Sequence, residues 1–173
     1  QDPISHYLKV LSDKTGSLIA LASEFGIQMA GGPEQYVGPV RQYGEKLGIA
    51  FQLIDDVIDL APKEADTGKL PGTDVKRGVT TLPMLYLQEL ASQGDEEASL
   101  LLAKLSLNNF GEVSEDEFLS YIDALREHPA TARTIETARS MAESAIRELD
   151  PIPDDIVKEG MIHFAHQVVE RSY

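Results

Sequence analysis

Apolar residues recur along this chain at intervals of three, four and seven positions. That spacing places side chains on one face of an α-helix. The clearest run lies near the N-terminus and consists of Tyr7, Leu8, Leu11, Leu18, Leu21, Ala22 and Phe25. It predicts a helix over residues 5–29. Gly31-Gly32-Pro33 should end this helix, because glycine and proline disfavour its continuation.

The same periodicity predicts six further helices, separated by segments rich in glycine, proline or charge. Pro33 suits the first turn of a helix, and Ser114 with Glu117 forms a capping-box signature. Residues 62–79 predict a long loop, and no alternating pattern predicts a sheet. We therefore expect one all-α domain over residues 1–173. Its helices after the first should cover 33–60, from 80 to Gly94, 95–107, from Ser114 to near His128, 130–149 and 154–171.

Composition narrows the possible classes of protein. The chain has 173 residues, 42% of them hydrophobic, which suffices for a compact core. Its 15 basic and 29 acidic residues give a net charge of -14, which argues against binding to nucleic acid or to an anionic membrane surface. No apolar stretch approaches the roughly 20 residues of a membrane span. Cysteine is absent, which excludes disulfides and thiolate chemistry. We expect a cytoplasmic protein that is not an integral membrane protein.

The segment FQLIDDVIDL, Phe51 to Leu60, places three aspartates in an otherwise apolar stretch of the second expected helix. Asp55 and Asp59 are one helical turn apart, and Asp56 lies about 100° around the helix axis. Like charges so close together raise one another's pKa unless a cation lies between them. Clustered carboxylate oxygens suit Mg²⁺, which commonly bridges carboxylates to a substrate phosphate. A solvated acidic helix face agrees with the spacing equally well.

Two neighbouring segments carry further candidate groups. In the loop after the aspartates, Lys69 is a candidate phosphate ligand and Asp74 a candidate for holding metal-bound water. In the first helix, Lys14-Thr15-Gly16 interrupts the apolar pattern, and a glycine inside a helix costs about 1 kcal/mol relative to alanine. One interpretation is a helix break that exposes a backbone carbonyl beside a cation and a hydroxyl. The other is an exposed lysine beside a tolerated glycine.

Together these segments resemble the all-trans isoprenyl diphosphate synthases, or polyprenyl synthetases. FQLIDDVID resembles the second aspartate-rich motif of that family, F-Q-x-x-D-D-x-x-D. GKLPGTD and TTLP resemble the loop and helix start that follow it, YLKVLSDKTGSLIALASEFG resembles the Lys-Thr helix, and residues 149–173 resemble the C-terminal end. The family's first aspartate-rich motif is missing here. The resemblance therefore implies the C-terminal half of an isoprenoid-synthase-type helical bundle.

The resemblance implies a Mg²⁺-dependent prenyltransferase. In the family an allylic diphosphate ionises, isopentenyl diphosphate attacks the cation, and a proton is lost. Val79 stands where many members have a lysine, so one cationic contact is missing, and Lys76 and Arg77 are alternative cations nearby. The implied site residues are Asp55, Asp56, Asp59 and Asp74 for Mg²⁺, and Lys14, Thr15, Gln52 and Lys69 for the allylic diphosphate and its cation.

Three hypotheses follow for the chain: part of an active prenyltransferase, a non-catalytic or regulatory subunit that works with a catalytic partner, and an acidic helical interaction domain. The complete second motif argues against the third, and the missing first motif leaves the second open. We expect the isolated chain to condense no isopentenyl diphosphate. We also expect a homodimer or pairing with an N-terminal half through an apolar wall on the helices of Leu8, Leu11, Leu18, Phe51 and Ile54.

Overall fold

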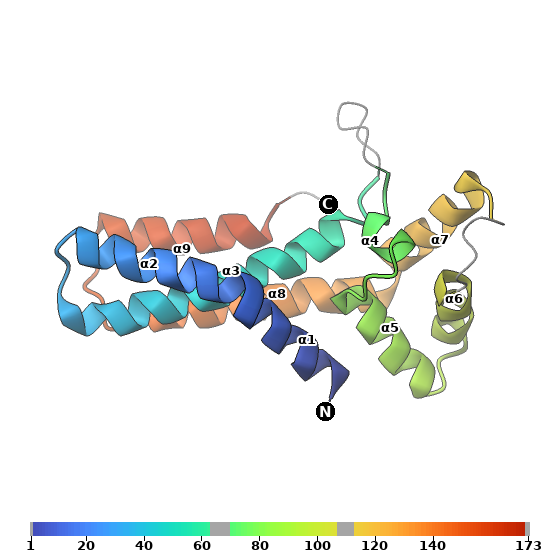
Figure 1. Cartoon of the computed structure of the whole chain (residues 1–173), viewed down its shortest axis with the longest axis horizontal. Helices are drawn as coiled ribbons and strands as arrows, with labels where there is room; N and C mark the ends of the chain where they lie inside the picture. Colours follow the sequence, from blue (N-terminus) through green and yellow to red (C-terminus); the bar gives the residue numbers. More distant parts are fainter. Residues whose placement is uncertain (1, 63–69, 107–112, 172–173) are drawn as a thin grey trace. The chain divides into compact units, whose positions relative to one another are not determined.

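The computed structural model describes residues 2–62, 70–106 and 113–171 (Figure 1). Every regular element in these ranges is a helix and no strand occurs there, which confirms the all-α prediction. None of these helices combines the length and the apolar character needed to cross a bilayer. The chain divides into two compact units. The first contains residues up to Ile54 together with Glu136–Arg171, and the second contains Asp55–Ile135.

The first unit is built from long helices that run beside one another (Figure 1). The hydroxyl of Tyr43 on α3 donates to the carbonyl of Met161 on α9 (2.8 Å). The ammonium of Lys46, one turn further along α3, donates to the hydroxyl of Ser144 on α8 (2.9 Å) and pairs with Glu148. The elements are α1 (Pro3–Leu11), the π-helical turn η1 (Ser12–Gly16), α2 (Ser17–Met29), the 3₁₀ turn η2 (Glu34–Tyr36), most of α3 (Val37–Ile58), the C-terminal part of α8 (Pro129–Glu148) and α9 (Ile156–Val169).

Glycines allow α3 to approach α2 and η1 closely. A β-carbon on Gly44 would lie 2.3 Å from the hydroxyl oxygen of Ser23 and 2.8 Å from the carbonyl oxygen of Ile19. A β-carbon on Gly48 would lie 3.0 Å from the α-carbon of Gly16. Any side chain at Gly44 would therefore push α2 and α3 apart. The close approach of Gly48 to Gly16 fixes the position of η1 against α3.

The second unit contains shorter helices around the fully buried side chains of Leu82, Leu87, Ile122 and Leu125. One of them, α4, lies within the segment that the sequence predicted as a loop. It begins after Gly72, whose φ of 71° favours glycine and whose α-carbon lies too close to Ile122 for a side chain to fit. One turn is too short to show helical periodicity. The elements are α4 (Thr73–Lys76), α5 (Leu82–Ser92), α6 (Glu96–Ser106) and α7 (Glu115–Glu127), with the ends of α3 and α8.

Most predicted helix boundaries agree with the structure to within a few residues. The capping box at the start of α7 is present, since the hydroxyl of Ser114 accepts from the N–H of Glu117 (3.2 Å). Pro33 precedes a 3₁₀ turn rather than an α-helix. The predicted apolar wall is partly wrong. Leu18 and Phe51 are exposed, but Leu11 and Ile54 are buried, because packing within the first unit covers their sides of the helices.

Candidate functional site

The Lys14-Thr15-Gly16 segment lies in the π-helical turn η1. The N–H of Ser17 donates to the carbonyl of Ser12, five residues earlier, and its hydroxyl donates to the carbonyl of Asp13 (2.7 Å). The helix is not broken at this segment, because it continues from α1 to α2 through a π-turn. Such turns often occur at functional positions, because they change which side chains and carbonyls share a face.

The π-turn brings Thr15 to Gln52, two of the residues selected from the sequence. The hydroxyl of Thr15 donates to the side-chain oxygen of Gln52 on α3 at 3.4 Å, and both side chains are half-buried. Gly16 makes this approach possible, since a β-carbon there would lie 3.0 Å from the carbonyl oxygen of Glu45. Lys14 is exposed. The site in the first unit therefore contains a pair of polar, oxygen-bearing side chains, and the exposed Lys14 directly precedes one of them in the chain.

The three aspartates of the motif lie in different environments. Asp55 is half-buried, whereas Asp56 and Asp59 are 4% and 6% exposed. One carboxylate oxygen of Asp56 accepts from the N–H of Leu82, the first residue of α5, at 3.3 Å. Thr81 occupies the N-cap position of α5 but makes no side-chain cap of its own. Asp56 therefore supplies an acceptor at the start of α5, where the helix dipole favours a negative charge.

Asp59 holds the chain that enters α4. Its carboxylate accepts from the backbone N–H of Asp74 (3.0 Å), and its carbonyl accepts from the N–H of Gly72 (2.7 Å). The structure thus brings the side chain of Asp59 to the backbone of Asp74. Asp74 itself is half-buried. Lys69, the candidate phosphate ligand, lies outside the described residues.

The donor set can be compared with what Mg²⁺ requires. Within 2–62, 70–106 and 113–171, no three acidic or histidine side chains are grouped so that they hold a metal ion by themselves. Mg²⁺ prefers oxygen ligands and is usually bound through one or two carboxylates, with substrate phosphates and water completing its shell. Carboxylates on one helix, without a full protein cage, fit an ion held jointly with a diphosphate.

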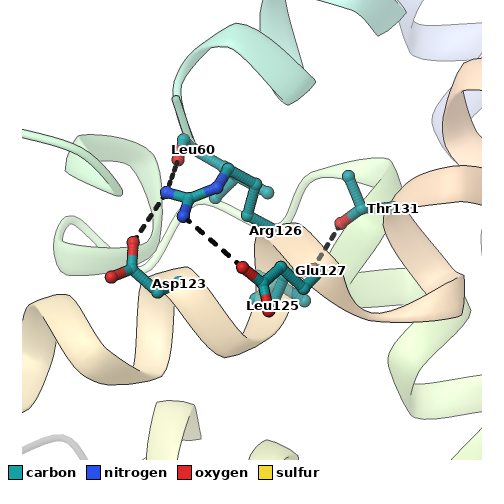
Figure 2. Close-up of polar contacts among 6 residues, drawn as sticks. All are labelled: Leu60, Asp123, Leu125, Arg126, Glu127 and Thr131. Atoms are coloured by element: carbon teal, nitrogen blue, oxygen red, sulfur yellow. Dashed lines mark hydrogen bonds and ion pairs between the residues drawn. The ribbon is translucent and has the colours of Figure 1, made fainter. Parts of the chain in front are cut away.

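The cations near the aspartates include one that sequence reasoning missed. Arg126 on α7 reaches the end of α3 (Figure 2), where its guanidinium donates to the carbonyl of Leu60 (3.5 Å) and to the carboxylate of Asp123 (2.6 Å). A cation at a helix C-terminus offsets the partial negative charge there. In the sequence the Asp123–Arg126 spacing indicates only a local ion pair. Lys76, considered as a substitute for the lysine missing at Val79, lies over the ring of Phe118 at 5.9 Å.

Arg171 is the second residue that sequence reasoning missed. Its guanidinium lies 4.1 Å from the centroid of the Phe51 ring, and its Nη2 donates to the carbonyl of Phe51 (3.0 Å). Its Nε donates to the carbonyl of Val168 on α9 (3.1 Å). Phe51 is the first residue of the aspartate motif, so the end of α9 contacts that motif directly. The sequence gives no signal for this pairing, because 120 positions separate the two residues.

The family model described as polyprenyl synthetase matches residues 1–118. The chain belongs to the polyprenyl synthetase family. The crystal structure of a geranylgeranyl pyrophosphate synthase from Corynebacterium glutamicum, complexed with calcium and isoprenyl diphosphate, matches with a TM-score of 0.80 at 30% identity, over 98% of this chain and 51% of that one. This agreement confirms the isoprenoid-synthase fold expected from the sequence.

The matches to two relatives cover about half of each relative's length. The nonaprenyl diphosphate synthase of Mycobacterium tuberculosis is 40% identical over 154 residues, which are 88% of this chain and 44% of that protein. The heptaprenyl diphosphate synthase component 2 of Geobacillus stearothermophilus is 28% identical over 171 residues, which are 99% of this chain and 51% of that protein. The chain therefore spans about half the length of the curated relatives it matches.

Proposed function

We propose that this chain is part of a trans-prenyltransferase that condenses an allylic diphosphate with isopentenyl diphosphate, releases diphosphate and forms an all-trans polyprenyl diphosphate. The observation that carries the proposal is that the three aspartates of FQLIDDVID lie in different environments. Asp56 and Asp59 are buried and accept backbone N–H groups, while Asp55 stays half-buried on the same helix. Membership of the polyprenyl synthetase family supports the same reaction.

The proposed metal ligands are the carboxylates of the motif. Asp55 and Asp59 bind Mg²⁺, and Asp56 and Asp74 act through bound water. Mg²⁺, when bound together with the substrate, supplies positive charge that stabilises the departing diphosphate. The hydrogen bonds that Asp56 and Asp59 accept limit the movement of their carboxylates, so that these side chains keep a fixed orientation.

The remaining residues act on the allylic group. Lys14 and Lys69 bind the allylic diphosphate as point charges. Its carbon–oxygen bond breaks, and the oxygens of Thr15 and Gln52 stabilise the allylic cation by their partial negative charge. The double bond of isopentenyl diphosphate attacks that cation and forms the new carbon–carbon bond. The released diphosphate takes the proton, so no side chain is required as a base.

We propose further that an N-terminal half with the family's first aspartate-rich motif completes the site, that the chain forms a homodimer or pairs with such a half, and that the protein is cytoplasmic. The match covers about half of the relatives' length, which supports a further half in the complete site. The alternative, a non-catalytic subunit acting with a catalytic partner, is supported by the similarity to a protein named as component 2 of a synthase.

The test uses a protein in which these 173 residues are joined to an N-terminal half, with labelled isopentenyl diphosphate, an allylic primer and Mg²⁺. We expect turnover by this protein and none by the 173 residues alone. Asp55→Asn should lower turnover by about 100- to 1000-fold. It should also weaken binding of pyrophosphate with Mg²⁺ in calorimetry. The control is Asp116→Asn, the same change at an exposed position on α7, which should behave as wild type. Unchanged binding in Asp55→Asn would contradict the proposal.

A further inference from the structure

Arg171 makes contacts that an ordinary surface arginine lacks. It is half-buried, donates to two backbone carbonyls and lies over an aromatic ring. The carbonyl of Val168 belongs to α9, whereas the carbonyl and ring of Phe51 belong to α3. The planar guanidinium is suited to such combined stacking and forked donation, and lysine is not. One side chain thus ties the end of α9 to a defined turn of α3.

That turn is the one that carries Gln52. The residue after Phe51 is Gln52, whose side-chain oxygen accepts from Thr15 in η1. The Thr15–Gln52 distance is 3.4 Å, a long hydrogen bond that depends on the orientation of the Gln52 side chain. Phe51 itself is 40% exposed, so packing covers only part of its ring. Arg171 contacts both the ring and the carbonyl of Phe51 at this turn.

We propose that Arg171 is a positioning residue for the Thr15–Gln52 pair. It fixes the Phe51 peptide, and thereby the direction in which Gln52 presents its oxygen, without touching the reacting atoms. The use of that pair in catalysis rests on the proposed function. The effect of Arg171 on the orientation of the Gln52 side chain does not rest on that function, because it is inferred from contacts within the first unit.

The experiment compares Arg171→Gln, Arg171→Lys and Phe51→Leu. The control is Arg147→Gln, the same change at an exposed position on α8. Two signals report the structure: the ¹⁹F resonance of 4-fluorophenylalanine at position 51 and the side-chain amide resonance of Gln52. The enzymatic readout is kcat and KM for the allylic diphosphate in the protein that carries the N-terminal half.

We expect Arg171→Gln to shift both resonances and to lower kcat about tenfold, as expected for a lost hydrogen bond from a charged donor. KM for the allylic diphosphate should change little. Arg171→Lys keeps the charge but lacks the planar fork that contacts both carbonyls and the ring, so it should restore the Gln52 signal and kcat only in part. Phe51→Leu keeps the carbonyl contact and should leave the Gln52 signal near its wild-type position. Arg147→Gln should change nothing.

An unmoved Gln52 signal would overturn the inference. A Gln52 signal that Arg171→Gln leaves unmoved would show that Arg171 does not orient this side chain. A higher KM for a diphosphate substrate with an unmoved Gln52 signal would make Arg171 a substrate ligand instead. If the joined protein turns over no substrate at all, the proposed function fails, and the two resonances still decide whether Arg171 fixes Gln52. A melting curve for each variant separates local effects from unfolding.

Discussion

The hydroxyl of Tyr43 should make the stability of the fold depend on pH. Burial raises the pKa of Tyr43 to about 12 from its ordinary value of 10.0, and the hydroxyl donates to the carbonyl of Met161. As the pH rises, the unfolded chain loses this proton before the folded chain does. The contribution of Tyr43 to stability is therefore complete below about pH 10 and is lost as the pH approaches about 12.

We expect the free energy of unfolding, measured with urea, to fall by about 1–2 kcal/mol more in wild type than in Tyr43→Phe between these pH values. The variant lacks both the titrating group and the hydrogen bond, so it should be less stable at neutral pH but less sensitive to alkali. Absorbance of tyrosinate would show a late-titrating group in wild type that is absent from Tyr43→Phe. Parallel curves for the two proteins would exclude Tyr43 as the source.

Asp59 has a structural task that can be separated from metal binding. Its carboxylate accepts from the N–H of Asp74 at the start of α4. Asparagine keeps an acceptor oxygen, whereas alanine leaves that N–H without its acceptor. We expect Asp59→Asn to be more stable than Asp59→Ala by about 1 kcal/mol or more in urea unfolding, while both lose Mg²⁺-dependent binding of pyrophosphate. Equal stability of the two variants would mean that the hydrogen bond contributes nothing to folding.

Two glycines of α3 separate the role of helix propensity from that of helix packing. A β-carbon on Gly38 would meet nothing within 4 Å, whereas one on Gly44 would meet Ser23 and Ile19. Gly38→Ala should raise the free energy of unfolding by up to about 1 kcal/mol, because alanine is the better helix former. Gly44→Ala should lower it by about 1–3 kcal/mol, because α2 and α3 must move apart. Thermal unfolding of both variants measures the difference, and a stabilised Gly44→Ala would contradict the packing.

The helices could be predicted from the sequence because each carries its own local signal. Ser114 caps α7, and the apolar spacing between Tyr7 and Phe25 marks the first helical stretch. The short helix α4 could not be predicted, since its stability depends on Gly72 lying against Ile122 and bonding to Asp59, which are contacts with distant parts of the chain. A π-turn also has no pattern that distinguishes it from an α-helical turn with a tolerated glycine.

The candidate site was predicted in its residue types and only in part in its geometry. The pairing of Thr15 with Gln52 agrees with the grouping taken from the family resemblance. The burial of Asp56 and Asp59 was not foreseen, because it depends on where the first turns of α5 and α4 are placed. Arg126 and Arg171 were missed for the same reason: each acts on a backbone carbonyl far away in the sequence.

At the scale of the whole molecule, exposed apolar side chains on α2 predict association. Leu18 is 65% exposed, Phe25 55% and Met29 87%, a combination that is uncommon on a monomer surface. The net charge of -14 opposes self-association through long-range repulsion, which salt screens. We therefore expect the 173 residues to associate, and more strongly at high salt than at low salt, in sedimentation velocity experiments.

The matched variants for that experiment replace one apolar side chain each. Leu18→Gln should weaken the association, whereas Ile156→Gln at the start of α9, where the side chain is 83% exposed, should not. A monomer at every salt concentration would contradict the prediction. Equal weakening by both changes would indicate nonspecific hydrophobic association in place of association through a defined surface on α2.

The π-turn Ser12–Gly16 is equivalent to one residue inserted into an otherwise continuous helix. It shifts the helical phase, so that α1 is rotated by about 100° about the axis relative to a regular continuation of α2. Removing Asp13 would let the segment wind as plain α-helix, with a gain in local regularity. The side chains of α1 would then point in new directions, while the packing of α2 against α3 would be unchanged. A single-residue deletion here would therefore alter the molecule's surface over the whole length of α1.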